Sequence, residues 1–125
     1  KMHEPTYLHQ TMGRAKDGSI VRFKDIPFAM AAIDQLRSLE ELRVHFHVPV
    51  NADRLSDELS TTNDHLKAAL DVIAKAPGAC RELEIETYTW EVLPPEVRAA
   101  DVADMIAEEY RWTLAELAQR GVKPL

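Results

Sequence analysis

The sequence contains a single cysteine, Cys80, and this scarcity excludes an internal disulfide and a cysteine-rich zinc module. Every apolar run falls short of the ~18 residues that a membrane span needs, so no membrane span is expected. Lys and Arg number 15 against 21 Asp and Glu, and the formal net charge is −6. A general nucleic-acid binder normally presents a basic face, so this balance argues against nucleic acid as a partner.

Several familiar motifs are also missing. The sequence has no glycine-rich dinucleotide or P-loop cradle, no nucleophile elbow, no HExxH, no CxxC and no EF-hand loop. These absences argue against nucleotide binding by the usual cradles and against a hydrolase with a nucleophile elbow.

The composition that remains is that of one globular domain. The chain has 125 residues, of which 46% are hydrophobic and 29% charged. Residues 1–5 lack the apolar segment of a signal peptide, and we expect a cytoplasmic protein.

Three segments have the alternating, β-branched or aromatic character of strands. They are residues 6–10, 43–48 and 82–90. Their centres lie roughly 40 residues apart, the length of a strand, a helix and two connections in a βα repeat. The spacing predicts an α/β fold. Asp17-Gly18, between the first strand and the first helix, predicts a turn at the tip of a small hairpin.

Helix signals follow each of these segments. Asp25 can cap a helix that has Pro27 in its first turn. Thr61 and Asp64 resemble a capping box, and Pro77-Gly78 is expected to end the helix that follows.

The last helix is expected to open at Pro94-Pro95 and to close at Gly121. Its apolar positions predict which face is buried. The expected stripe comprises Val102, Met105, Ile106, Tyr110, Thr113 and Leu117.

Side chains alternate between the two faces of a strand, and each expected strand has one apolar and one ionisable face. His9, the pair His45 and His47, and the acids Glu84 and Glu86 all fall on ionisable faces. A parallel sheet buried on both sides would read as continuously apolar, so this face must look at something other than a plain core.

A barrel interior near its mouth would explain the pattern, because these side chains would converge there. Imidazole and carboxylate groups are ligands for Zn, Mn or Co. The same cluster could transfer protons without a metal.

Simpler interpretations remain open at each position. A His-x-His pair can be two hydrogen-bonded structural histidines, and glutamates along a strand can be the solvent face of an edge strand. Tyr88 could stack a ligand or simply pack. Cys80 reads as an inert core thiol, and His65 as a surface residue.

Three segments together resemble the EboE family of metabolite traffic proteins: Tyr7-Leu8-His9-Gln10, the Arg43–Pro49 stretch RVHFHVP and the Glu84–Pro94 stretch EIETYTWEVLP. That family belongs to the xylose-isomerase-like group of sugar-phosphate isomerases and epimerases. The resemblance implies a (β/α)₈ TIM barrel, of which residues 1–125 would be the C-terminal part, about three βα units holding strands six to eight. The chain would then be a fragment whose partner is the missing N-terminal half of the barrel or another copy of itself.

The resemblance also implies the site. Glu86, His47 and His9 would hold a divalent metal (Zn, Mn or Co), and His9 and His45 would serve as acid–base groups. Glu84 and Tyr88 would support the ligands from behind.

The expected function is that of a metal-dependent isomerase or epimerase acting on a small polyhydroxylated or cyclitol-like metabolite. The alternative is a non-catalytic protein that binds such a metabolite at the barrel mouth. A purely structural or interaction module is a third reading.

Overall fold

The computed structural model describes residues 7–76, 78–86 and 101–123. The chain divides into two compact units, Lys1–His47 and Val48–Leu125, and each is described by itself.

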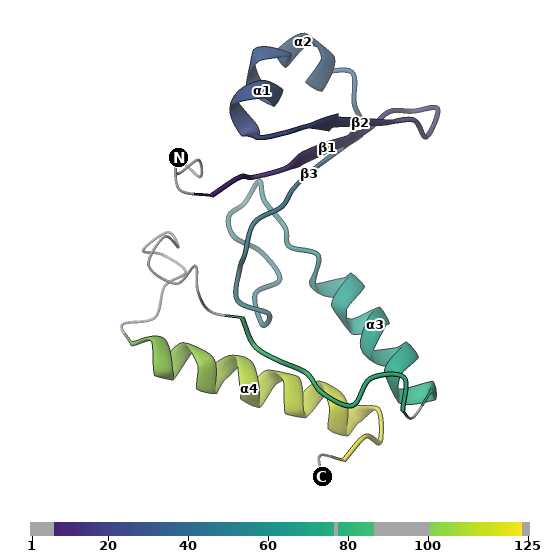
Figure 1. The fold of residues 1–125 in the computed structure, drawn as a ribbon, viewed down its shortest axis with the longest axis vertical. Coiled ribbons are helices and arrows are strands. Elements are labelled where there is room, and N and C mark those ends of the chain that lie inside the picture. Colours follow the sequence, from purple (N-terminus) through teal and green to yellow (C-terminus); the bar gives the residue numbers. More distant parts are fainter. Residues whose placement is uncertain (1–6, 77, 87–100, 124–125) are drawn as a thin grey trace. The chain divides into compact units, whose positions relative to one another are not determined.

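The first unit contains a three-stranded sheet with two short helices on one of its sides (Figure 1). The strands are β1 (Thr11–Arg14), β2 (Ile20–Phe23) and β3 (Glu41–Val44), arranged in the order β2-β1-β3. Both pairings are antiparallel. The helices α1 (Ile26–Ala31) and α2 (Ile33–Leu36) connect β2 to β3.

A tight turn joins β1 to β2, as the Asp17-Gly18 signal predicts. The Ala15 N–H donates to the Ser19 carbonyl at 3.0 Å, and the Gly18 N–H donates to the Ala15 carbonyl at 2.9 Å. Gly18 has a φ of 84°, which a residue with a side chain rarely adopts. The hairpin prediction is confirmed.

The predicted start of α1 is also confirmed. Asp25 is the N-cap residue, and its carboxylate accepts a hydrogen bond from the Ile26 N–H at 2.7 Å. Pro27 stands in the first turn, where its missing N–H costs no hydrogen bond.

On the inner side of the sheet, Gly13 and Leu39 lie so close that a side chain at position 13 would overlap Leu39. Gly13 lies on the central strand directly under the side chain of Leu39, and an added Cβ would overlap Leu39 Cδ1. Thr11, on the same face, is 1% exposed, and Ala29 of α1 is buried as well. A side chain at position 13 would therefore require Leu39 to move.

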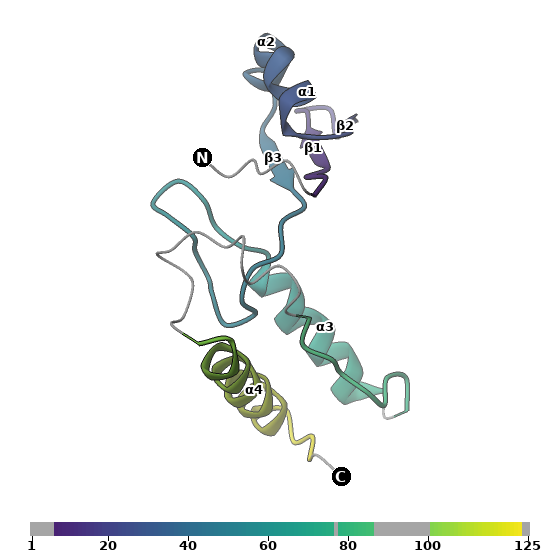
Figure 2. The same cartoon turned by 60° about the vertical axis from the view of Figure 1, so that its left-hand side comes forward.

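The second unit consists of two helices and the segments that contact them (Figure 2). The helices are α3 (Asn63–Lys75) and α4 (Val102–Gln119), which pack against each other. Leu70 of α3 and Met105 of α4 are buried. A loop, residues 48–60, precedes α3 and contains one isolated bridge, between Arg54 and Ser60.

The helix ends correct one prediction and confirm two. The N-cap residue of α3 is Thr62, whose side chain makes no capping hydrogen bond, so the capping box expected at Thr61 and Asp64 is wrong. The Thr61 hydroxyl accepts a hydrogen bond from the Asn63 N–H at 3.3 Å and donates one to the Ala52 carbonyl at 2.6 Å. The α3 helix ends at Lys75, just before the expected Pro77-Gly78 stop. The Val122 N–H bonds the Leu117 carbonyl, which closes α4 next to Gly121 as expected.

The start of α4 and its buried face differ from the prediction. Asp101, in an extended conformation, caps the helix through a 2.6 Å bond from the Ala103 N–H, and α4 begins at Val102. Pro94-Pro95 lies outside the described residues. Tyr110 of the expected stripe is 57% exposed, whereas Glu109 is buried. The buried face is therefore rotated towards Glu109.

The expected strand positions are only partly met. No strand covers residues 7–10, and β3 overlaps the expected segment 43–48 only at its first two positions. Residues 82–86 form no strand, and residues 87–90 lie outside the described part. The sheet pairs antiparallel, unlike the parallel sheet of a βα repeat. Membership of a TIM barrel stays a prediction, and the interpretation of the chain as a fragment stays one too.

Candidate functional site

The first unit contains a buried polar cluster around His9. The His9 side chain is 4% exposed, and its backbone N–H donates to Asp25 Oδ1 at 3.1 Å. The Thr11 hydroxyl donates to the His9 carbonyl at 3.0 Å. Asp25 thus caps α1 and fixes the chain at His9 with one carboxylate oxygen.

The His9 ring also has two neighbours. Its Nδ1 lies 3.8 Å from Asp25 Oδ1, and the ring stacks on Phe46 with centroids 5.2 Å apart and planes at 23°. Phe46 stands between the two exposed-face histidines in the sequence. The stacked pair therefore fixes the segment that carries His45 and His47.

His45 and His47 lie side by side just after β3. Their ring centroids are 5.1 Å apart, with the planes tilted by 35°. His45 is exposed, and His47 is half-buried. The strand-like alternation that predicted a shared face is preserved here, although β3 ends at Val44.

Gln10 orients the His45 ring. The backbone N–H of His45 donates to the Gln10 carbonyl at 2.8 Å, and His45 Nδ1 lies 2.9 Å from Gln10 Oε1. An amide oxygen only accepts, so the proton of a neutral His45 sits on Nδ1. The Nε2 lone pair is then the one that can coordinate a metal or accept a proton.

The remaining expected site residues belong to other parts of the chain. Glu84 and Glu86 are exposed and belong to the second unit, and Tyr88 lies outside the described residues. Within residues 7–76, 78–86 and 101–123, no group of three or more His, Cys, Asp or Glu side chains is placed to hold a metal ion. The assignment of His47, His9 and Glu86 as metal ligands stays a prediction.

The structure contradicts the prediction for Cys80 and confirms the one for His65. Cys80 is exposed, so the prediction of a core thiol is wrong; its Sγ lies 3.1 Å from the Glu82 carbonyl oxygen. His65 is exposed on α3, as predicted for a surface histidine.

The second unit contains a buried polar cluster, formed by Glu109, Asn63 and the main chain of Val50, that the sequence did not predict. Glu109 of α4 is 2% exposed, and its Oε2 accepts a hydrogen bond from the Val50 N–H at 2.8 Å. Asn63 at the start of α3, also buried, donates its amide to the Val50 carbonyl. Both main-chain groups of Val50 are therefore held by side chains, which attaches the 48–60 loop to both helices.

Burial raises the pKa of Glu109, and the hydrogen bond from the Val50 N–H offsets part of that shift. Among the described residues, Glu109 Oε1 and Asn63 Oδ1 are buried without a hydrogen-bond partner. The only sequence signal for this cluster is that Glu109 falls one turn after Met105, on the face that α4 buries.

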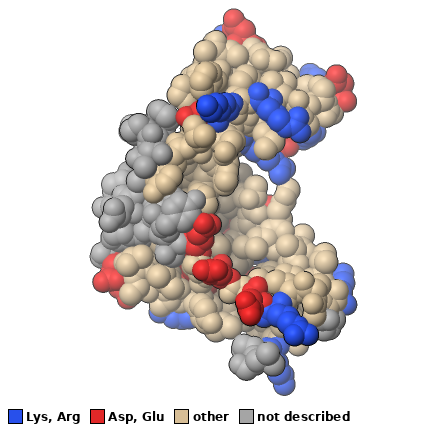
Figure 3. Space-filling model, in the orientation of Figure 1, with Lys and Arg blue, Asp and Glu red and all other residues tan. Residues whose placement is uncertain are grey.

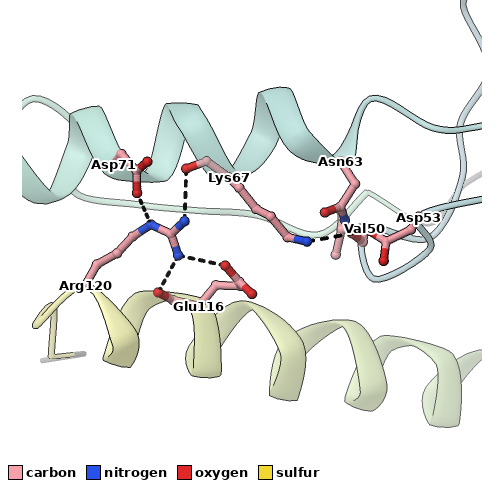
Figure 4. A network of polar contacts seen from close by, with 7 residues as sticks. All are labelled: Val50, Asp53, Asn63, Lys67, Asp71, Glu116 and Arg120. Atoms are coloured by element: carbon pink, nitrogen blue, oxygen red, sulfur yellow. Dashed lines mark hydrogen bonds and ion pairs between the residues drawn. The ribbon is translucent and has the colours of Figure 1, made fainter.

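Arg120 links the two helices at the other end of the unit (Figure 4). Its guanidinium contacts Asp71 Oδ1 at 2.5 Å, Glu116 Oε2 at 2.7 Å and the Lys67 carbonyl at 3.2 Å. The pKa of Arg120 is raised by its hydrogen bonds to Glu116 and then Asp71. These contacts occupy the guanidinium, so Arg120 serves the packing of α3 on α4.

Comparison with known protein families, with characterised proteins and with solved structures found no match for this chain. A membrane-crossing helix, one both long and apolar enough, does not occur among the described residues, in agreement with the expectation of no membrane span.

Proposed function

We propose that this chain belongs to a metal-dependent protein of the isomerase or epimerase type, and that His45 and His47 bind a divalent metal together. The observation that carries the proposal is the paired imidazoles, 5.1 Å apart, with His45 oriented by Gln10. Metal-bound histidines commonly donate their second ring N–H to an oxygen acceptor, which is the part that Gln10 plays here.

The donor set suits Zn, Mn or Co, because imidazole nitrogen is a ligand for all three. Bound at this pair, the metal would supply Lewis-acid polarisation of a carbonyl or hydroxyl oxygen. The part of this chain is to hold the two imidazole rings side by side, with the Nε2 lone pair of His45 set by Gln10. His9 stacks on Phe46, the residue between the paired histidines in the chain, and so helps to hold the segment that carries both. Glu86 as a further ligand is a separate prediction of the resemblance.

The proposed substrate is a small polyhydroxylated or cyclitol-like metabolite. His45, on the exposed side of the pair, is the group placed to take or return a proton beside the polarised carbon. The substrate class rests on the resemblance, and the metal site rests on the geometry.

Metal binding tests the first step. The chain is titrated with Co²⁺, whose visible absorption reports nitrogen ligation, and with Zn²⁺ in competition. We expect His47→Ala to abolish the Co²⁺ absorption and Gln10→Ala to weaken binding by roughly tenfold, the usual effect of losing an outer hydrogen bond. His65→Ala is the matched control, because this histidine is exposed on α3. Equal binding by the wild type and His47→Ala would refute the site.

Solvent exchange tests the second step. An isomerase or epimerase incorporates deuterium from the solvent beside the carbonyl of its substrate, and a panel of inosose- and ketose-type compounds can be followed by NMR. Metabolite binding without exchange would support the non-catalytic reading. Glu86→Gln should then change affinity only, whereas in an enzyme it should abolish turnover.

A further inference from the structure

One strand-like segment of the second unit pairs with no strand in the described part of the chain. Residues 82–86 alternate between acidic and apolar side chains, with Glu82, Glu84 and Glu86 on one side and Leu83 and Ile85 on the other. Within the described part of the chain, the main-chain groups of Leu83, Glu84 and Ile85 make no hydrogen bond to other main-chain groups. All three glutamates are exposed, and Leu83 is 50% exposed.

Acidic side chains form a row on the surface over the course of this segment (Figures 1 and 3). The segment therefore presents one charged side and one apolar side, and at Leu83, Glu84 and Ile85 it has main-chain groups without a main-chain partner among the described residues.

The first unit contains an edge of matching character. In the order β2-β1-β3, the outer edge of β2 has no partner strand among the described residues. Alternate residues of an antiparallel edge strand direct their N–H and C=O groups outward. On β2, Val21 and Phe23 are half-buried on the inner face, and Arg22 is exposed on the outer face.

The basic side chains on the outer face near β2 are not engaged in ion pairs with described residues. Arg14 and Arg43 are both bound to Glu41, at 3.0 and 2.6 Å, and these contacts hold the pKa of Glu41 below its ordinary value. Arg22 has no ion pair within the described ranges, and neither has Lys24, which follows β2. The β2 side of the sheet is therefore basic, whereas the β3 side contains an acid.

We propose that residues 82–86 of a second copy of this chain add to the outer edge of β2 as an antiparallel strand. In this register Glu84 lies opposite Arg22 and Glu82 opposite Lys24 on the outer face. Leu83 lies opposite Phe23 and Ile85 opposite Val21 on the inner face. Four of the five pairs match in character, the exception being Glu86 opposite Ile20, and a shift of one residue would place acidic residues opposite apolar ones in these four pairs.

The observations favour a protein strand over a small anion, because a small anion would use Arg22 and leave the exposed main chain and apolar side unused. They favour a second copy because the donor segment and the acceptor edge belong to one sequence. Each copy would give one strand and receive one, and this reciprocal exchange closes a dimer.

A charge exchange tests the proposal in solution. The mass of the wild-type chain in sedimentation experiments should rise to that of a dimer over about a hundredfold range of concentration. Arg22→Glu and Glu84→Lys should each weaken the dimer at least about tenfold, because like charges then face each other. The double variant R22E/E84K should restore dimerisation. Arg37→Glu and Glu58→Lys, at exposed positions away from both elements, are the matched controls.

Each alternative outcome is distinct. A wild-type chain that stays monomeric over the whole range overturns the proposal and assigns Arg22 and Lys24 to protection of a bare edge. A double variant that stays monomeric while circular dichroism shows it folded overturns the pairing of Arg22 with Glu84. Strand pairing that is detected by NMR and does not depend on concentration would place the contact within one chain.

Discussion

Glu109 is the residue whose replacement tests the structure of the second unit most sharply. Its carboxylate is almost fully buried and accepts a hydrogen bond from the Val50 N–H at 2.8 Å. Two properties can be separated by substitution: the acceptor for Val50 and the charge. Glu109→Ala removes both, and Glu109→Gln removes the charge while keeping an acceptor of the same reach.

The alanine variant leaves the Val50 N–H buried without a partner, which costs about 1–3 kcal/mol of folding free energy. That is a large part of the ~5–15 kcal/mol by which an ordinary domain is stable. The glutamine variant keeps an oxygen towards Val50 and removes the buried charge. We therefore expect Glu109→Gln to be at least as stable as the wild type near neutral pH.

The pH dependence follows from the direction of the pKa shift. Burial raises the pKa of Glu109 in the folded state, so the folded protein binds more protons than the unfolded chain between the two pKa values. The stability contributed by Glu109 is therefore complete below its ordinary pKa and is lost as the pH rises through the raised value. Glu109→Gln has no proton to lose, so the difference between the variant and the wild type should grow with pH.

Urea unfolding followed by circular dichroism from about pH 4 to about pH 8 measures this difference. Glu108→Gln, an exposed neighbour on α4, is the control for a general change in charge. The reasoning is refuted if Glu109→Gln loses as much stability as Glu109→Ala. It is also refuted if the wild type and Glu109→Gln keep a constant difference across the pH range.

Three further substitutions test the packing and capping described above. Asp25→Ala should destabilise the first unit by roughly 1–2 kcal/mol, because α1 loses its cap and the His9 N–H loses its acceptor; Asp25→Asn should lose much less, and thermal unfolding distinguishes the two. Gly13→Ala should cost about 1–3 kcal/mol through overlap with Leu39, and a smaller loss from Gly13→Ala in a Leu39→Ala background than in the wild type would confirm that contact. Arg120→Lys should lower the unfolding midpoint nearly as much as Arg120→Ala, since an ammonium cannot span Asp71, Glu116 and the Lys67 carbonyl; full retention of stability by the lysine variant would contradict the role of the planar guanidinium.

Local signals were read correctly from the sequence where a few neighbouring residues decide the structure. Asp25 with Pro27 starts α1, and Asp17-Gly18 makes the hairpin turn, because capping and turn geometry depend on side chains within about four residues. Strand pairing is different, since it depends on segments far apart in the chain. The alternation around His45 and His47 predicted their shared face. It could not predict that β3 pairs antiparallel with β1 or that β3 ends at Val44.

The site shows the same division between local and distant effects. Spacing predicted that His45 and His47 lie together, and the structure brings them to 5.1 Å. Nothing in the spacing indicated that Gln10 would orient His45, because that contact requires the pairing that continues from β1 and β3. The burial of Glu109 was not predicted because a glutamate on a helix normally faces water. Its burial depends on Val50, a loop residue whose N–H needs an acceptor.

Buried polar side chains in both units hold main-chain groups rather than one another. Asp25 binds the N–H groups of His9 and Ile26, and Glu109 with Asn63 binds both main-chain groups of Val50. A segment without regular structure has main-chain groups that must be paired when it is packed against helices. Short strands of four residues provide few such pairs, so side chains supply the remainder. In the first unit this use of Asp25 fixes His9, whose ring stacks on Phe46, the residue between His45 and His47 in the chain. Asp25 thus both stabilises the fold of the first unit and, through His9 and Phe46, helps to hold the segment that carries the candidate metal site, so Asp25→Ala should weaken Co²⁺ binding as well as folding.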